Sequence, residues 1–284
     1  THLGKPADHT VRLDAKLLLE AIKIVAGAAS IEKYPPVLNG IHFEKAGSTL
    51  TLTAADGFVL YSAQLPVLGQ VRTVTPDWNA LATAKELVRE LPKKKGKGTA
   101  EVDLVPVSAL FDKKPPQPGV SISINGQDIK PSTPGGTFPN YKQLTPDVSK
   151  YKWSVTVSRD DLKTAVEAVE KDASKGSGIV RLLHTDKGLA ITYFYEDEES
   201  VLAKLVQRLR HTGESDPLKS YIALNVKFLL YVVNKAFAAG SLVTIHVYTR
   251  SSPIVFSGSI VQTIVTMPMF VRPLDVKQVE KIMD

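Results

Sequence analysis

Residues 155–172 read VTVSRDDLKTAVEAVEKD and join a short alternating run to a helical pattern. Ser158 followed by Asp161 has the form of a capping box, in which a hydroxyl and a carboxylate satisfy free N–H groups at the start of a helix. After this box, apolar residues recur at helical spacing at Leu162, Ala165, Val166 and Val169. The stretch therefore predicts a strand that leads into an amphipathic helix over residues 160–172.

The same plan occurs earlier in the chain. Residues 11–14 read VRLD and lead into a helical pattern from Lys16 to Ala29, with apolar positions at Leu18, Ile22, Val25 and Ala29. Strand-like runs, separated by turn residues, follow each helix. These runs cover 37–44, 49–54 and 58–65 in the first half, and 178–184, 189–194 and 201–206 in the second. The chain therefore contains an internal repeat.

Each half also contains a second helical pattern with further strands after it. The helical patterns cover 78–91 and 226–238, and the strands after them include 119–125, 242–249, 254–257 and 261–266. Two helix-plus-three-strand units in each half can place sheets on one side and helices on the other, which is an α+β fold. We expect one domain over 10–147, a similar one over 152–272, and a C-terminal extension over 273–284.

The composition is that of a globular protein, and 284 residues suit two domains. The formal net charge of +6 permits a polyanionic partner, although simple solubility would also account for it. The absence of cysteine excludes a disulfide scaffold and thiolate chemistry and fits a reducing cytoplasm. No apolar run is long enough to cross a membrane. Because the chain does not begin with methionine, we expect its native N-terminus to have been cleaved or to lie upstream.

The residues that usually carry catalysis form no recognisable pattern. The histidines lack metal-ligand spacing and lie at positions 2, 9, 42, 184, 211 and 246. No serine lies in a nucleophile elbow, and no glycine-rich dinucleotide fingerprint follows a strand. Asp56-Gly57 suits a tight turn between strands better than a metal site, and the acidic run 196–199 suits a solvated turn. We therefore expect no enzymatic activity, no metal and no cofactor.

A set of short segments carries a more specific signal. They are PVLNGI at 36–41, LTLTAADG at 50–57, GTFPNY at 136–141, NVKFLL at 225–230, SPIV at 252–255 and VTMPM at 265–269. In this order they resemble the bacterial DNA polymerase III β subunit (β sliding clamp) family. The first three resemble the middle domain of that family, the next two resemble its last domain, and the final one resembles its terminal signature. The resemblance extends from about residue 11 to residue 272.

The resemblance implies a ring of six similar domains, with sheets outside and helices inside, that encircles duplex DNA. Such a ring is a processivity factor, which an ATP-driven loader opens and which tethers a DNA polymerase. A chain with two of the family's three domains would close the ring as a trimer, or it would be a fragment whose first domain is missing. The alternative is a clamp-fold adaptor or regulator that binds partner peptides without encircling DNA. The resemblance also implies a cytoplasmic protein encoded by a bacterium, phage or plasmid.

A clamp must hold DNA without reading its sequence, and contacts to backbone phosphates do this while permitting sliding. Given the resemblance, the polar stripes of the helices become candidate DNA contacts rather than ordinary solvated faces. The candidate residues are Lys16, Lys23, Lys85, Arg89, Lys227 and Lys235. The third helix is the weakest candidate, because Lys163 is accompanied by Glu167 and Glu170. The basic loop 92–98 is either a further phosphate contact or a solvated turn.

The resemblance also implies a hydrophobic pocket for short peptides of DNA polymerases and clamp-loader subunits, where the middle and last domains meet. The matching positions are Leu38, Gly57, Phe58, Val59, Leu60, Pro139, Leu144, Val265, Met267, Pro268 and Met269. Soft methionine side chains in an apolar cleft can accept a peptide that carries Leu or Phe. A strand over residues 265–269 would instead place at least one of the two methionines in the core.

The sequence departs from the family's pattern in four places. Phe58 and Val59 stand where the family carries a polar and basic pair, and Gln143 and Phe270 stand where it carries arginine. We therefore expect a more apolar pocket with a different preferred peptide. The segment 273–284 passes the family's usual end, and its apolar residues predict either a short amphipathic helix or disorder; they are Val276, Val279 and Ile282.

Overall fold

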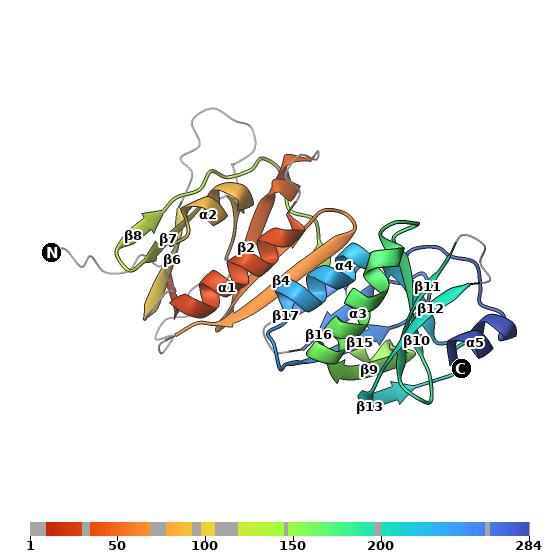
Figure 1. Ribbon diagram of the computed structural model, residues 1–284. Helices are drawn as coiled ribbons and strands as arrows, with labels where there is room; N and C mark the ends of the chain where they lie inside the picture. The colour runs from red at the N-terminus through yellow and green to blue at the C-terminus, as the bar shows by residue number, and fades with distance from the viewer. Residues whose placement is uncertain are drawn as a thin grey trace. The chain divides into compact units, whose positions relative to one another are not determined.

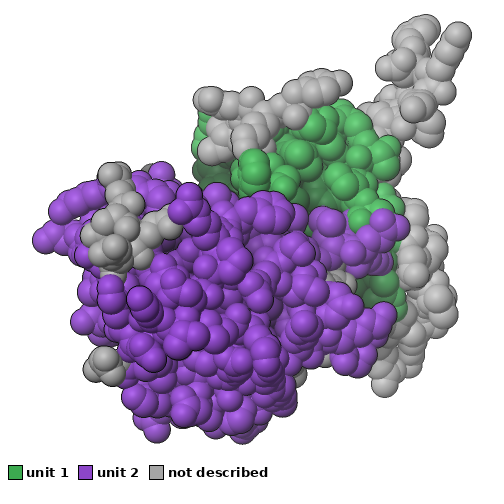
Figure 2. All heavy atoms as spheres, turned by 90° about the vertical axis from the view of Figure 1, so that its right-hand side faces the viewer, with its two compact units in different colours: residues 1–140 green, residues 141–284 purple. Residues whose placement is uncertain are grey.

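The computed structural model describes residues 10–29, 35–68, 78–92, 98–105, 119–144, 147–195, 200–258 and 262–283. The chain divides into two compact units, Thr1–Asn140 and Tyr141–Asp284, which Figure 2 distinguishes by colour. Both units combine helices with antiparallel sheets, so the expected α+β fold class is confirmed (Figure 1). Within these ranges no helix is both long enough and apolar enough to cross a membrane.

The first unit contains two repeats of one plan, a strand, a helix and three further strands. The first repeat consists of β1 (Thr10–Asp14), α1 (Ala15–Val25), β2 (Gly40–Ala46), β3 (Thr49–Ala55) and β4 (Val59–Pro66). The second repeat consists of β5 (Trp78–Thr83), α2 (Ala84–Glu90), β6 (Thr99–Val105), β7 (Gly119–Ile124) and β8 (Gln127–Ile129). Short 3₁₀ turns at Ala26–Ala28 and Pro36–Asn39 connect α1 to β2.

The second unit repeats this plan with additions. Its first repeat consists of β9 (Trp153–Ser158), α3 (Arg159–Ala173), β10 (Ile179–His184), β11 (Leu189–Phe194), β12 (Val201–Val206) and the added β13 (Arg208–Gly213). Its second repeat consists of β14 (Tyr221–Asn225), α4 (Val226–Tyr231), a π-helical continuation (Val232–Ala236), β15 (Leu242–Val247), β16 (Ile254–Ser257) and β17 (Gln262–Thr266). A last helix, α5 (Val276–Met283), ends the described chain, so the helical alternative for the extension is confirmed.

The two repeats of each unit exchange their leading strands. In the first unit β1 pairs with β6 and β5 pairs with β2, which gives the strand orders β1-β6-β7-β8 and β5-β2-β3-β4. In the second unit β9 pairs with β15 and β14 pairs with β10, which gives β13-β9-β15-β16-β17 and β14-β10-β11-β12. Neither repeat completes a sheet by itself, so both repeats are needed to form the sheets of a unit.

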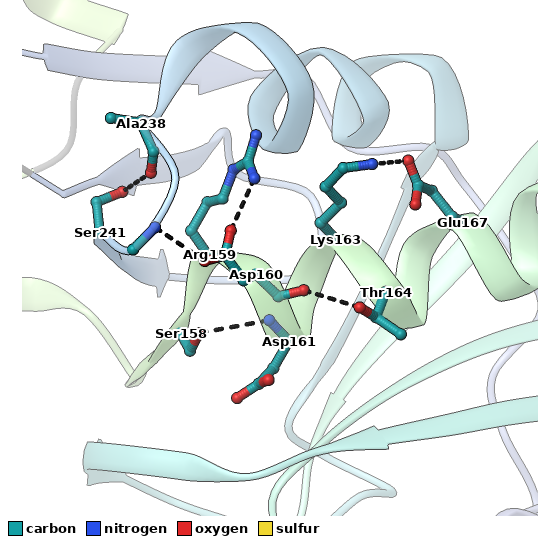
Figure 3. Close-up of polar contacts among 10 residues, drawn as sticks. Ser158, Arg159, Asp160, Asp161, Lys163, Thr164, Glu167, Ala238 and Ser241 are labelled. Atoms are coloured by element: carbon teal, nitrogen blue, oxygen red, sulfur yellow. Dashed lines mark hydrogen bonds and ion pairs between the residues drawn. The ribbon is translucent and has the colours of Figure 1, made fainter.

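Local capping and a buried stripe explain the two long helices. On α1, the Asp14 carboxylate accepts a hydrogen bond from the Leu17 N–H (2.9 Å), and the buried face packs on β3 and β4. On α3, the Ser158 hydroxyl accepts from the Asp161 N–H (3.4 Å), as the capping box predicts (Figure 3). The buried stripe of α3 faces β11, β12 and α4 and includes Leu162.

The predicted helix over 78–91 is wrong in its first half. Residues Trp78–Thr83 form β5 and pair with β2, and the helix begins only at Ala84. Residues 80–82 are all buried, so the strand has no clear alternation and its apolar run also fits a helix. The predicted strand over 37–44 is also too long at its start, because Pro36 begins a 3₁₀ turn and the strand begins at Gly40.

Candidate functional site

The cations predicted on the first unit's helices lie at the surface. Lys16 and Lys23 are exposed on α1, with the exposed Glu20 between them in sequence. Lys85 is exposed on α2, whereas Arg89 forms an ion pair with Glu90 on the same helix (3.3 Å). Both lysines of α1, and Lys85, lack an ion-pair partner within the described residues.

The α2 helix also carries a carboxylate that is held in its charged form. Glu86 Oε2 accepts a hydrogen bond from the backbone N–H of Ser132 (2.7 Å). This bond lowers the pKa of Glu86, and the Ser132 side chain and Arg89 lower it further. At the other end, the Gln127 side chain donates to the Glu90 carbonyl (2.8 Å) and satisfies a free carbonyl at the end of the helix. The cations of α2 are therefore balanced by Glu86 and Glu90.

The most uniformly basic helical segment is Val226–Ala236, which comprises α4 and its π-helical continuation. Lys227 and Lys235 are exposed there, and the sequence VKFLLYVVNKA contains no acidic residue. The helix begins with the Asn225 side chain, which accepts a hydrogen bond from the Lys227 N–H (2.9 Å). Burial raises the pKa of Tyr231 to about 12, so its phenol stays neutral and adds no negative charge.

The α3 helix is acidic. It carries three basic residues, which are Arg159, Lys163 and Lys171. It carries five acidic residues, which are Asp160, Asp161, Glu167, Glu170 and Asp172. Figure 3 shows Lys163 directed at Glu167 one turn further along the helix, where the two form an ion pair. Asp160 accepts from the Arg159 guanidinium (2.8 Å) and from the Gly240 N–H (2.8 Å), and these bonds lower its pKa. The excess of acidic residues is the reason why α3 is the weakest of the candidate DNA-contacting helices.

In the first unit, several predicted pocket residues lie in one turn between β3 and β4. The Asp56 carboxylate accepts from the N–H groups of Phe58 (2.8 Å) and Val59 (2.9 Å), and Gly57 adopts a φ of +94°. This confirms the interpretation of Asp56-Gly57 as a tight turn. The Phe58 side chain is 56% exposed at the tip, whereas Val59 and Leu60 are buried. Of the predicted pocket residues in this turn, only Gly57 and Phe58 are therefore exposed to solvent.

Leu38 and Pro139 belong to two segments that pack together in the same unit. Gly136 has a φ of +110°, and a Cβ there would lie 3.3 Å from the Val37 Cβ. Two positions further on, the ring of Phe138 stacks on His42 (4.9 Å between centroids, planes 3° apart). These contacts hold the neighbouring Leu38, which is half-buried, and Pro139, which is exposed, in the same region of the unit.

The remaining predicted pocket residues lie in the second unit. Val265 is buried in β17, but the strand ends at Thr266, and Met267 and Met269 are 39% and 36% exposed. Neither methionine is therefore a core residue, and the strand alternative for this segment is wrong. The Met269 N–H donates to the Ala223 carbonyl (2.8 Å), which fixes the segment beside β14. Pro268 is half-buried, and Leu144, in the 3₁₀ turn Tyr141–Leu144, is 46% exposed.

Sequence reasoning missed a polar cluster around the buried His184 in the second unit. The imidazole of His184 stacks on Trp153 (5.5 Å) and lies against His211 (5.4 Å). Its Nδ1 donates to the Glu214 carbonyl (2.9 Å), because a carbonyl oxygen can only accept, and its Nε2 therefore accepts from Arg208 (3.2 Å). Burial lowers the pKa of His184, and Arg208 and His211 lower it further, although the bond to Glu214 opposes this. No sequence motif joins these residues, since three strands, β9, β10 and β13, and the residue after β13 contribute them.

Two sequence features fall on parts of the chain without a structural description. They are residues 93–97 of the basic loop and the acidic run 196–199. Among the residues that are described, no three His, Asp or Glu side chains come together as a metal site.

Comparison with known proteins gives a clear result for the fold. No protein-family model matches the sequence, and no curated protein matches it. The DNA polymerase III β subunit of Thermotoga maritima matches with a TM-score of 0.74 and 22% identity, over 96% of this chain and 68% of that chain. The DNA polymerase sliding clamp of Bacillus subtilis matches with a TM-score of 0.75 and 15% identity, over 96% and 67%. The DnaN sliding clamp of Bartonella birtlesii, bound to griselimycin, gives 0.69 and 20%, over 95% and 68%.

The chain therefore has the fold of the bacterial DNA sliding clamps, and the resemblance inferred from sequence segments is confirmed for the fold. It spans about two thirds of the length of these clamps. The TM-scores of 0.74 and 0.75 show a common fold, and at identities of 22% and 15% they show the fold alone.

Proposed function

We propose that this protein is a DNA sliding clamp, a non-enzymatic processivity factor that encircles duplex DNA and tethers a polymerase. The observation that carries the proposal is the match of 95–96% of the chain to DNA polymerase III β subunits and sliding clamps at TM-scores of 0.69–0.75. In this proposal residues 10–147 and 152–272 are the two clamp domains. Bacterial DNA lies in the cytoplasm, and we place the protein there.

The charges on two helical segments support DNA contact. Lys16 and Lys23 on α1, and Lys227 and Lys235 on Val226–Ala236, are exposed and could reach phosphates in any sequence context. Lys85 and Arg89 on α2 complete the proposed set, although Glu86 and Glu90 offset them. Binding that depends on a few lysines should be weak and salt-dependent, as sliding requires.

The proposed assembly is a closed ring of three chains. A sliding clamp must surround the duplex, and head-to-tail contacts between identical chains close only at a fixed rotation. Six domains form the ring in the resembled family, so chains with two domains reach that number in threes. A third domain ahead of residue 1 in a longer protein would instead make two chains sufficient. The mass of the assembled protein distinguishes the two.

The residues proposed for peptide binding include exposed apolar side chains in each unit. Four large apolar residues of the proposed set are at least one-third exposed: Phe58, Leu144, Met267 and Met269. Such side chains suit a Leu- or Phe-bearing peptide from a DNA polymerase or a clamp-loader subunit. Because Phe58, Gln143 and Phe270 replace charged or polar residues of the family's pattern, we expect a peptide with fewer acidic groups at this pocket.

One observation favours a second function, that of an adaptor that binds peptides without encircling DNA. The α3 helix carries five acidic residues against three basic ones, and a negatively charged helix would repel phosphate. The two functions differ in a simple experiment. A clamp is retained on nicked circular DNA and slides off when the circle is cut once, whereas an adaptor elutes identically with both.

A further inference from the structure

The start of strand β13 is attached to the second unit by a side chain more than by its backbone ladder. The register of its pairing with β9 shifts between Arg208 and Arg210, so Leu209 has no partner in the ladder. The strand lies at the edge of its sheet, and residues 209–213 are all exposed. A strand with so few buried side chains can separate locally at low cost in free energy.

The other end of β13 is fixed by its backbone. Gly213 has a φ of +82°, and a Cβ there would collide with the Lys152 carbonyl, so the two segments come closer than a larger residue would permit. The carbonyl of the next residue, Glu214, accepts the hydrogen bond from His184 Nδ1 (2.9 Å). Neither contact involves Arg208. Gly213 is therefore positioned as a hinge, and Arg208 as a separate attachment.

The attachment at Arg208 depends on a neutral histidine. The Arg208 guanidinium donates to His184 Nε2 (3.2 Å) and to the Thr185 carbonyl (2.6 Å). His184 is fully buried. An imidazole nitrogen accepts a hydrogen bond only when it carries no proton, so the bond from Arg208 requires His184 to be uncharged. We call the contact between Arg208 and His184 the β13 latch.

A proton on His184 removes the acceptor of the β13 latch. Both nitrogens of an imidazolium donate, so an N–H at Nε2 would face the N–H of Arg208, with two positive charges close together and shielded from water. The bond from Nδ1 to Glu214 survives, because Nδ1 donates in both charge states. We therefore propose that protonation of His184 is a pH-sensitive switch that releases the Arg208 end of β13, while the Gly213 end stays in place.

The groups around His184 leave its charge uncompensated. Trp153 of β9 is uncharged, and His211 of β13 is a second titratable ring at 5.4 Å. No carboxylate among the described residues forms an ion pair with His184. The other charged side chains nearby bond to different partners; they are Asp186, Lys187, Glu214, Asp216, Lys219 and Arg250. The pKa of His184 is accordingly lowered, first by burial.

Hydrogen–deuterium exchange of the full chain at pH 7.5 and pH 5.5 tests the switch. Each measured rate is divided by the intrinsic rate at the same pH, so that the ratio reports structural opening. When the latch is open, His184 regains its ordinary pKa of 6.5. Opening over residues 208–213 should therefore increase by up to about tenfold at pH 5.5. Peptides from α3 should show no such increase.

Three variants assign the response to the β13 latch. In His184→Gln, the amide can donate to Glu214 and accept from Arg208 without taking a proton, so residues 208–213 should stay protected at both pH values. Arg208→Met keeps the apolar stem but removes the latch, so the segment should open equally at both pH values. His211→Gln is the matched control, because it removes the neighbouring ring and leaves the latch intact, and it should keep most of the response.

Equal protection of residues 208–213 at the two pH values in the wild type would overturn the inference. A full response in His184→Gln, or its loss in His211→Gln, would assign the effect to another group. An equal increase in the peptides from α3 would show a loss of global stability instead of a local switch. If His184→Gln does not fold, Arg208→Met decides, since a response as large as that of the wild type would show that Arg208 holds nothing in place.

Discussion

On α3, Lys163 forms an ion pair with Glu167 one turn further along the helix (Figure 3). This pair, together with four other carboxylates on the same helix, leaves α3 with no excess of positive charge. The Val226–Ala236 segment of the same unit carries two exposed lysines and no acid. A ring built from this chain would therefore hold DNA unevenly, mainly through α1 and through the segment that contains α4.

The first prediction concerns these lysines. Charge reversal in Lys16→Glu/Lys23→Glu or in Lys227→Glu/Lys235→Glu should lower retention on nicked circular DNA about tenfold or more, because each lost phosphate contact removes counterion release. Gel filtration of the protein–DNA complex at several salt concentrations measures this. The matched control is Lys204→Glu/Lys277→Glu, which reverses two exposed charges outside the four helices of the repeats. Equal losses in the control and the helix variants would remove α1 and α4 from the DNA surface.

The second prediction concerns the proposed peptide pocket. Met267→Ala/Met269→Ala should weaken the binding of a Leu- and Phe-bearing polymerase peptide by about 1–3 kcal/mol, because two exposed apolar contacts are removed. Isothermal titration calorimetry gives the affinity directly. Val276→Ala is the control, because Val276 is an exposed apolar residue of α5. If the double variant binds the peptide as tightly as the wild type, the assignment of the pocket to these methionines is wrong.

The third prediction concerns packing in the first unit. A Cβ at Gly40 would lie 2.7 Å from the Pro134 ring, which cannot swing aside. Gly40→Ala should therefore destabilise the unit by about 1–3 kcal/mol, as overpacking of a tight contact does. Gly135→Ala is the control, because nothing lies within 4 Å of a Cβ at that position, and its stability should stay within about 0.5 kcal/mol of the wild type. Urea unfolding checks both variants, and equal stabilities would contradict the packing of 134–138 against β2.

The fourth prediction concerns pH. The pKa of His184 is lowered in the folded protein, first by burial, so below its unfolded value of 6.5 the unfolded chain binds a proton that the folded chain does not. Stability should therefore fall as the pH decreases from about 7.5 to about 5.5, and the loss should continue down to the folded pKa. In His184→Gln the contribution of His184 to the pH dependence of stability should vanish. A smaller pH dependence should remain, because burial also lowers the pKa of His246. Urea midpoints across this range test it, and an unchanged pH slope in the variant would contradict the role of His184.

Local signals were sufficient to predict α3 almost to the residue. The cap at Ser158, the stripe from Leu162 to Val169 and the following turn all lie within one short segment. The same kind of reasoning was wrong for residues 78–83, because burial on both faces of β5 removes the alternation that marks a strand. Its pairing with β2 is a long-range property that no short window contains.

The exchange of leading strands between repeats could not be predicted for the same physical reason. Periodicity indicates which residues are strands, but the partner of β1 is β6, about ninety residues away, and hydrogen-bond partners depend on the whole fold.

The central claim is that this chain closes into a ring around DNA, and its mass in solution tests this most directly. Light scattering coupled to gel filtration, at micromolar protein and moderate salt, should give a mass three times that of a single chain. A mass of one chain throughout the micromolar range would contradict the account, because a monomer with two clamp domains cannot surround a duplex.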